Sequence, residues 1–111
     1  MKVELNRRLV LETPTKVNDG AGGFSLVWVA EGELWAEIVP GAGSETAGVE
    51  VSLSKVPYRI TVRGAPVGSE RRPRPEQRLV DGARVFTILA VTERDADGRF
   101  LICFAREEEP K

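Results

Sequence analysis

Few residues of this chain have side chains suited to catalysis or metal binding. Histidine is absent and Cys103 is the single cysteine, which excludes Ser–His and Cys–His nucleophile pairs. Asp95 and Asp97 are close in sequence, but they stand in a turn-like segment and offer too few oxygen ligands for an EF-hand calcium site. Glu37 and Glu45 resemble ordinary surface acids. We therefore expect no enzymatic activity, no catalytic or metal site, and no cofactor.

Arginines gather in one proline-rich stretch near residues 71 to 78. The cluster consists of Arg71, Arg72, Arg74 and Arg78. Such cations can contact phosphates without reading bases, which suits DNA or a single-stranded nucleic acid. Glu70 and Glu76 dilute the charge, and no nearby row of aromatic residues supports base stacking. The cluster therefore leaves three interpretations open: contacts to nucleic acid, contacts to another subunit, or a solvated loop.

Length and composition set the frame for these side chains. The chain has 111 residues and a net charge of −1, which predicts one domain over residues 1–111 and gives no bulk attraction to nucleic acid or anionic membrane. No apolar run approaches the roughly 20 residues that span a bilayer, and the N-terminus lacks a signal-peptide core. These features favour a soluble, intracellular protein.

Short runs of alternating apolar residues predict about six strands joined by hairpins. The predicted strands cover residues 3–12, 24–30, 33–39 (ending at Pro40), 56–63, 78–80, 83–91 and 99–106. Turn signals separate them at residues 13–15, 18–23, 31–32, 81–82 and 95–98, and 81–82 suits a type I′ turn. No long helix is convincing. The pattern predicts an all-β fold, either a sandwich or a small antiparallel barrel, and closure favours the barrel because it removes exposed edges.

Two glycine- or proline-rich stretches, residues 41–55 and 64–77, are predicted to be long loops. A third glycine cluster, residues 18–23, is predicted to be a hairpin loop. A phosphate-binding loop is the alternative, but such loops lead into a helix, whereas here a strand follows.

The strand pattern also predicts the core. Residues 24–30 are apolar on both faces, which suggests that part of this strand is sandwiched. Cys103 stands in an apolar strand and is expected to be a small buried hydrophobe. The expected core residues are Trp28, Trp35, Ala36, Ile38, Tyr58, Ile60, Val62, Phe86 and Ile88.

An ordered series of segments resembles one known family. The segments are Leu5-Asn6-Arg7-Arg8-Leu9, Asp19-Gly20-Ala21-Gly22-Gly23-Phe24 followed by Trp28, Leu34 to Pro40 with Gly43-Ser44-Glu45, Tyr58 to Arg63, and Asp81-Gly82 leading into Phe86 to Val91. Together they resemble the phage head–tail adaptor family, also called head–tail joining or head-closure (stopper) proteins. Relatives occur in tailed phages, prophages and gene transfer agents.

The resemblance implies a small β-barrel that forms a homo-oligomeric ring in the virion, at the head–tail interface, after synthesis in the bacterial cytoplasm. The implied partners are portal–adaptor ring proteins, tail terminator or tail-tube proteins, and packaged double-stranded DNA held without sequence specificity. The implied function is to extend the DNA channel, help retain DNA and present a docking surface to the tail. A small barrel that binds single-stranded nucleic acid is the alternative.

The resemblance also implies that the loop before Tyr58 projects toward the lumen or neighbouring subunits. Its candidate assembly residues are Gly41, Gly43, Ser44, Glu45, Glu50 and Lys55. We expect bulky replacements of Gly41 and Gly43 to impair assembly more than folding. Arg71, Arg72, Arg74 and Arg78 are the candidate contacts to DNA or to another subunit.

Overall fold

A computed structural model describes residues 2–41 and 57–108. Within these ranges the regular structure consists of strands, without helices. The strands are β1 (Arg7–Asn18), β2 (Phe24–Pro40), β3 (Pro57–Arg63), β4 (Arg78–Asp81), β5 (Arg84–Glu93) and β6 (Phe100–Glu107). The same residues hold no helix long and apolar enough to cross a membrane. The expectation of an all-β fold with about six antiparallel strands is confirmed.

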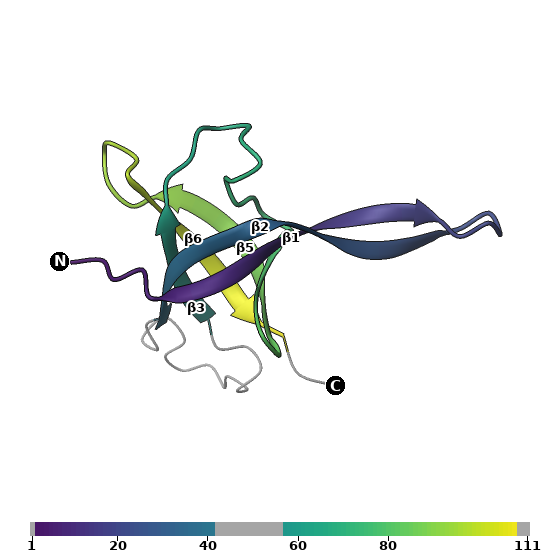
Figure 1. Ribbon diagram of the computed structural model, residues 1–111, viewed down its shortest axis with the longest axis horizontal. Coiled ribbons are helices and arrows are strands. Elements are labelled where there is room, and N and C mark those ends of the chain that lie inside the picture. The colour runs from purple at the N-terminus through teal and green to yellow at the C-terminus, as the bar shows by residue number, and fades with distance from the viewer. Residues whose placement is uncertain (1, 42–56, 109–111) are drawn as a thin grey trace, which may run out of the picture.

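The strands pair in the order β1-β2-β3-β6-β5-β4, and β4 returns to pair with β1, so that the sheet closes into a barrel (Figure 1). All pairings are antiparallel. Inward-facing side chains fill the barrel, because successive side chains of a strand point to opposite faces. The buried core residues are Leu9, Leu11, Ala36, Ile60, Val62, Leu79, Phe86, Ile88, Leu101, Cys103 and Ala105.

The first hairpin is longer than the barrel. β1 and β2 pair from Arg7↔Ala36 out to Asn18↔Phe24, whereas β4 pairs with β1 only from Val10 to Glu12. The distal halves of both strands therefore pair only with each other, and they project from the barrel as a two-stranded ribbon (Figure 1). We call residues 13–30 the arm.

Two predicted turns in this hairpin are wrong. β1 runs through residues 13–15, where Pro14 pairs with Trp28 in the ribbon. Proline is tolerated there because the strand has no neighbour on its other side that needs a donor. Residues 31–32 are also inside a strand: Leu11 pairs with Gly32 and Glu12 with Ala30, which leaves Glu31 as the extra residue of a β-bulge.

The predicted hairpin between β4 and β5 exists, but its loop lies one residue later. Asp81 pairs with Arg84, so the loop is Gly82-Ala83. Gly82 has a φ of 59°, whereas Ala83 is not among the residues with positive φ. A single positive φ at the first loop position matches a type II′ turn rather than the type I′ turn expected.

The predicted core residues divide into three groups. Ala36, Ile60, Val62, Phe86 and Ile88 are buried in the core, and Ile38 and Tyr58 are partly buried against it. Trp28 lies outside this core, half-buried on the arm, so its assignment to the core is wrong. Trp35 is 55% exposed, so its assignment to the core is wrong. It points outward because its strand neighbours Leu34 and Ala36 face the barrel interior.

Candidate assembly surfaces

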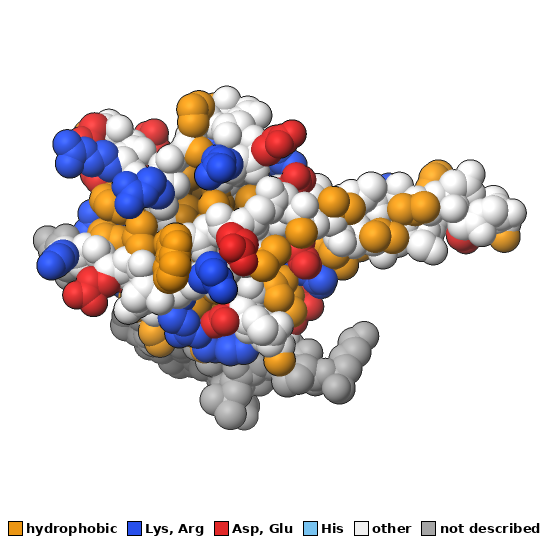
Figure 2. Space-filling view, in the orientation of Figure 1, with side chains coloured by type: hydrophobic (Ala, Val, Ile, Leu, Met, Phe, Trp, Pro, Cys, Tyr) orange, Lys and Arg blue, Asp and Glu red, His pale blue; other side chains and the backbone are white. Residues whose placement is uncertain are grey.

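The arm exposes apolar side chains on both of its faces. The register places Phe24, Leu26 and Trp28 on one face and Val17, Val27 and Val29 on the other. Phe24 is 71% exposed and Leu26 is 57% exposed. Figure 2 shows apolar side chains spaced along the face of the projecting ribbon that is in view. An isolated two-stranded hairpin is marginally stable in water, so such a ribbon is suited to packing against another molecule.

The base of the arm is fixed to the barrel by polar contacts. The Arg78 guanidinium lies 4.1 Å from the ring centroid of Trp28, and its Nε donates to Glu12 at 2.6 Å. Buried Gln77 donates through Nε2 to the Thr13 hydroxyl at 2.9 Å. These contacts hold the base of the arm against Gln77 and Arg78, at the start of β4. They therefore fix the direction in which the arm leaves the barrel.

The tip of the arm is a structured acidic loop. The Asp19 carboxylate accepts hydrogen bonds from the backbone N–H groups of Ala21 at 2.8 Å and Gly23 at 3.0 Å. These bonds lower the pKa of Asp19, so it is ionised at neutral pH. The loop also confirms the hairpin expected at residues 18–23, because a strand and not a helix follows it.

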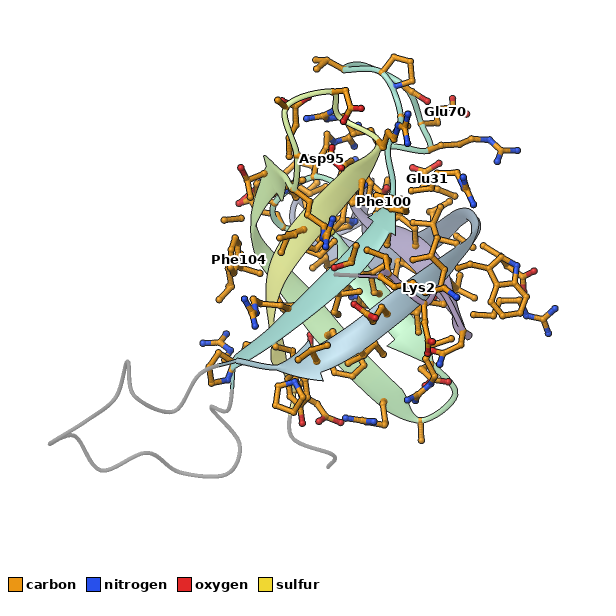
Figure 3. All side chains as sticks on the ribbon, turned by 90° about the vertical axis from the view of Figure 1, so that its left-hand side faces the viewer. Lys2, Glu31, Glu70, Asp95, Phe100 and Phe104 are labelled. Carbon is orange, nitrogen blue, oxygen red and sulfur yellow. The ribbon has the colours of Figure 1, made fainter. Side chains whose placement is uncertain are left out.

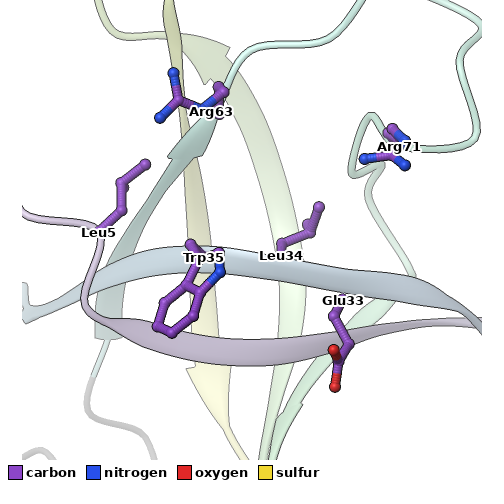
Figure 4. A pocket seen from close by; sticks show the side chains of 6 residues that line it. All are labelled: Leu5, Glu33, Leu34, Trp35, Arg63 and Arg71. Atoms are coloured by element: carbon purple, nitrogen blue, oxygen red, sulfur yellow. The ribbon is translucent and has the colours of Figure 1, made fainter.

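A pocket of about 450 Å³, which we call the outer pocket, lies between the N-terminal segment, β2 and the loop that follows β3. Leu5, Leu34 and Trp35 form its apolar walls, and Arg63 and Arg71 stand at its edge (Figure 4). Glu33 completes the lining. In the described part of the chain, the ion pairs include one between Glu33 and Arg8 at 3.6 Å and none to Arg63 or Arg71. The pocket is therefore apolar with an excess of positive charge.

The four arginines predicted to contact DNA or subunits do not form one patch. Arg72 donates through Nη1 to the Ala65 carbonyl at 2.9 Å, and Arg78 is held by Glu12 and Trp28. Both side chains therefore support the loop and the arm. Arg71 and Arg74 are exposed, and Arg71 lines the pocket. Only two of the four arginines, Arg71 and Arg74, are therefore free of these supporting contacts and exposed for binding nucleic acid at this loop.

Of the predicted assembly loop, the structure describes only Gly41; Gly43, Ser44, Glu45, Glu50 and Lys55 lie outside the described residues. The Gly41 N–H donates to the Pro57 carbonyl at 2.7 Å. A Cβ at Gly41 would meet the Pro57 side chain at 3.0 Å and its carbonyl at 3.2 Å. Gly41 thus belongs to the β2–β3 pairing, and a bulky residue there is expected to disturb folding as well as assembly.

The two ends of the barrel carry different features. β2 ends and β3 begins at one end, whereas Arg63 leads into residues 64–77 at the other end, as Figure 1 shows. Near the end where β2 stops and β3 begins, the Arg84 guanidinium donates to both carboxylate oxygens of Glu107, at 2.8 and 3.0 Å. This hydrogen-bonded pair lowers the pKa of Glu107 and raises that of Arg84.

A second apolar region lies on the outer side of the sheet. Phe104 of β6 points outward and is labelled in Figure 3. A cavity of about 250 Å³ nearby is lined by Val39 and Ile102 together with Glu37 and Arg59. Glu37 accepts a hydrogen bond from the Glu4 backbone N–H at 3.1 Å, which gives it a structural contact. Glu45, the acid considered with it, lies outside the described residues.

The described residues contain no group of three or more metal-ligating side chains. Cys103 is fully buried in the core, and burial raises its pKa to about 12. The thiol therefore lacks the exposed, thiolate-forming setting of a reactive cysteine. The prediction that it is a buried hydrophobe is confirmed.

The sequence patterns did not reveal the arm, although two signals pointed to it. Val27 and Val29 alternate with Leu26 and Trp28, so the strand is apolar on both faces, and we interpreted this as burial inside one domain. Gly32 has a φ of 146°, which marks the bulge where the arm leaves the barrel. A strand that is apolar on both faces and lies next to a glycine where the pairing shifts is the signal that indicates such an arm.

A closed sheet with a projecting apolar arm and a charged outer pocket has the features of an assembly protein. The model of the phage head completion protein family matches residues 2–108, and the chain belongs to this family. It is a family of structural virion proteins, which is not an enzyme class.

Two solved structures are similar to the chain. One, described as the virion of a native gene transfer agent particle, contains a chain that is 59% identical, with 99% of this chain and 100% of that chain covered and a TM-score of 0.80. The other is a solution structure of a Shigella flexneri 2a protein, at 22% identity, with 96% of each chain covered and a TM-score of 0.70. The second likeness concerns the fold alone. No curated protein matches the chain significantly.

Proposed function

We propose that this protein completes the head of a phage-like particle as a structural component of the virion. The observation that carries the proposal is the 59% identity, over 99% of the chain, to a chain in the virion of a gene transfer agent particle. Because the two chains are 59% identical and each is covered almost completely by the other, we expect them to share the barrel, the arm and the outer pocket. The particle itself is a phage, a prophage product or a gene transfer agent.

The finer proposal is that copies of the chain form a ring between the portal–adaptor complex and the tail, and that this ring helps to retain packaged DNA. The projecting arm and the outer pocket support it, since a ring subunit needs two different surfaces for its neighbours. DNA contact would be non-specific and modest. The chain carries a net charge of −1, and Arg71 and Arg74 are the cations of the arginine cluster that remain exposed.

Removal of the gene in a producing strain tests this proposal. Cells without the protein should fill heads with DNA but yield few tailed particles, and purified heads should lose DNA. A plasmid copy of the wild-type gene should restore particles of normal buoyant density. Normal yields of tailed, DNA-filled particles without the gene would refute the proposal.

The alternative function is that of a module that binds single-stranded nucleic acid. An oligonucleotide-binding assay at low salt distinguishes it from head completion. A head completion protein should bind weakly, and replacement of Arg71 and Arg74 by Gln should change little in particle yield. Tight binding that Arg71→Gln and Arg74→Gln abolish would favour the alternative.

A further inference from the structure

One face of the arm has two exposed apolar side chains beyond a covered base. Arg78 covers Trp28, so the exposed part of this face begins at Leu26 and ends at Phe24. The β1 residues opposite these two are Lys16 and Asn18. Phe24 and Leu26 therefore form a narrow apolar ridge at the end of the ribbon.

An ionised acid stands beside that ridge. Between Glu12 and Glu31, Asp19 is the one acidic residue, and its hydrogen bonds to Ala21 and Gly23 hold the carboxylate in place. The tip thus presents an apolar ridge next to a fixed negative charge.

The outer pocket offers the complementary features on the same chain. Leu5, Leu34 and Trp35 supply apolar walls, and the guanidinium groups of Arg63 and Arg71 supply positive charge without an ion pair in the described residues. Trp35, at 55% exposure, is an aromatic side chain of the kind that anchors interfaces.

The arm cannot fill the pocket of its own chain. It extends away from the barrel on the side opposite the N-terminal segment that carries Leu5 (Figure 1). Trp35 pairs with Arg8, near the inner end of the same hairpin whose outer end carries Phe24. The two strands between them stay paired out to Asn18 and Phe24, so the occupant must come from another molecule.

We propose that the Phe24–Leu26 ridge of one copy docks in the Leu5–Trp35 pocket of a second copy, with Asp19 facing Arg63 and Arg71. The contact joins two different surfaces of the chain, so it is heterologous, and its repetition gives a closed ring when the rotation between copies closes. The inference rests on the proposed function because a ring is what brings neighbouring copies together. It adds which residues form the contact and which face of the arm is used.

Cross-linking between engineered cysteines tests this contact. Asn18→Cys lies on the ridge face of the arm, opposite Phe24, and Arg8→Cys lies opposite Trp35 beside the pocket. Native Cys103 is buried, with a pKa raised to about 12, and should not react. A short bismaleimide should convert the double variant into a ladder of covalent oligomers, whereas each single variant should stay monomeric, because a heterologous contact needs both positions.

The matched control moves the arm cysteine to the opposite face. Thr15→Cys shares its face with Val27, and combined with Arg8→Cys it should give no ladder. The experiment uses purified protein at millimolar concentration and heads assembled in cells that supply each variant. No ladder from Asn18→Cys with Arg8→Cys in heads that contain the protein, or a ladder from the Thr15→Cys control instead, would overturn the proposal.

The charge contact has its own test. Asp19→Asn keeps a carbonyl oxygen for the tip hydrogen bonds and removes the charge, and Arg71→Gln removes one partner. Each change should slow ladder formation about two- to fivefold, as for an exposed ion pair, and the two together should slow it no more than Asp19→Asn alone. Additive effects would contradict a direct pairing of Asp19 with Arg71.

These outcomes separate the docking contact from the proposed function. If the cysteine variants complete heads but give no ladder, the docking contact is wrong and the function stands. If the wild-type chain is absent from heads, the proposed function fails first.

Discussion

The first hairpin contains two regions with the same strand pairing and opposite surroundings. In the inner region, Leu9 and Leu11 face the barrel core and β4 covers the edge of β1. In the arm, Phe24 and Leu26 face solvent, and the two strands pair only with each other. Alternating apolar residues thus indicate a strand that will be covered, but they do not say whether the cover comes from the same chain.

The difference between the regions follows from one local feature. The bulge at Glu31, next to Gly32, lies where β1 loses its pairing with β4. Bulges increase strand twist and redirect a ribbon. Inside this point, apolar side chains are buried in the barrel core; outside it, the same kind of side chain faces solvent.

The largest effect is expected from truncating a core residue. Phe86 is fully buried and packs edge-on against Tyr58, with 5.3 Å between the two ring centroids. Phe86→Ala should lower the free energy of unfolding by about 3 to 5 kcal/mol, through lost burial and the cavity left behind. Phe24→Ala in the arm is the matched control and should change the free energy of unfolding by less than about 0.5 kcal/mol. Urea unfolding measures both, and equal losses would contradict the division into two regions.

A smaller effect is expected at the junction. Arg78→Met keeps the apolar stem but removes the hydrogen bond to Glu12 and the contact with Trp28. The loss should be about 2 kcal/mol, since a charged hydrogen bond and a cation–π contact disappear together. Hydrogen exchange should show faster exchange at the base of the arm. Arg74→Met, at an exposed position, should leave both measurements unchanged; a similar loss there would show that the effect is one of net charge.

Gly32 is expected to contribute through the backbone alone. Its φ of 146° disfavours other residues, although a Cβ there would meet no atom within 4 Å. Gly32→Ala should lower stability by about 1 kcal/mol and change the direction of the arm, which spin labels at the tip and barrel can detect. Ser25→Ala should do neither. Unchanged stability in Gly32→Ala would mean that the bulge relaxes without strain.

The smallest effect concerns pH. The hydrogen bonds from Arg84 lower the pKa of Glu107 from its ordinary value of 4.5. A carboxylate with a depressed folded-state pKa stabilises the fold above its unfolded pKa, and this stabilisation is lost as pH falls through the folded pKa. Glu107→Gln should therefore lower stability at pH 7 by under about 1 kcal/mol and flatten its decline below pH 4.5. Parallel pH curves for the two proteins would refute the assignment.

Much of the barrel could be predicted from the sequence. Tyr58 to Arg63 alternates cleanly, and the structure buries Ile60 and Val62 as expected. The hairpin loop at residues 18–23 and the end of β2 at Pro40 were also predicted, because glycine and proline restrict the backbone locally.

The arm could not be predicted, because it depends on long-range pairing. Pro14 and Gly32 are local turn signals, but the extended pairing of β1 with β2 overrides them. Trp35, by contrast, shares its face with Glu33 and Glu37. Alternation therefore indicates an outward tryptophan, and the core assignment did not use this signal. The pocket also depends on Arg71, which reaches it from a loop far along the chain.

The central claim is that the barrel folds alone and the arm serves assembly. Its most direct test replaces residues 13–29 with Asn-Gly, which joins the paired residues Glu12 and Ala30 through a two-residue hairpin turn. We predict that this shortened chain unfolds cooperatively at nearly the wild-type urea concentration but fails to restore tailed, DNA-filled particles. A shortened chain that does not fold, or one that folds and completes heads normally, would contradict the account.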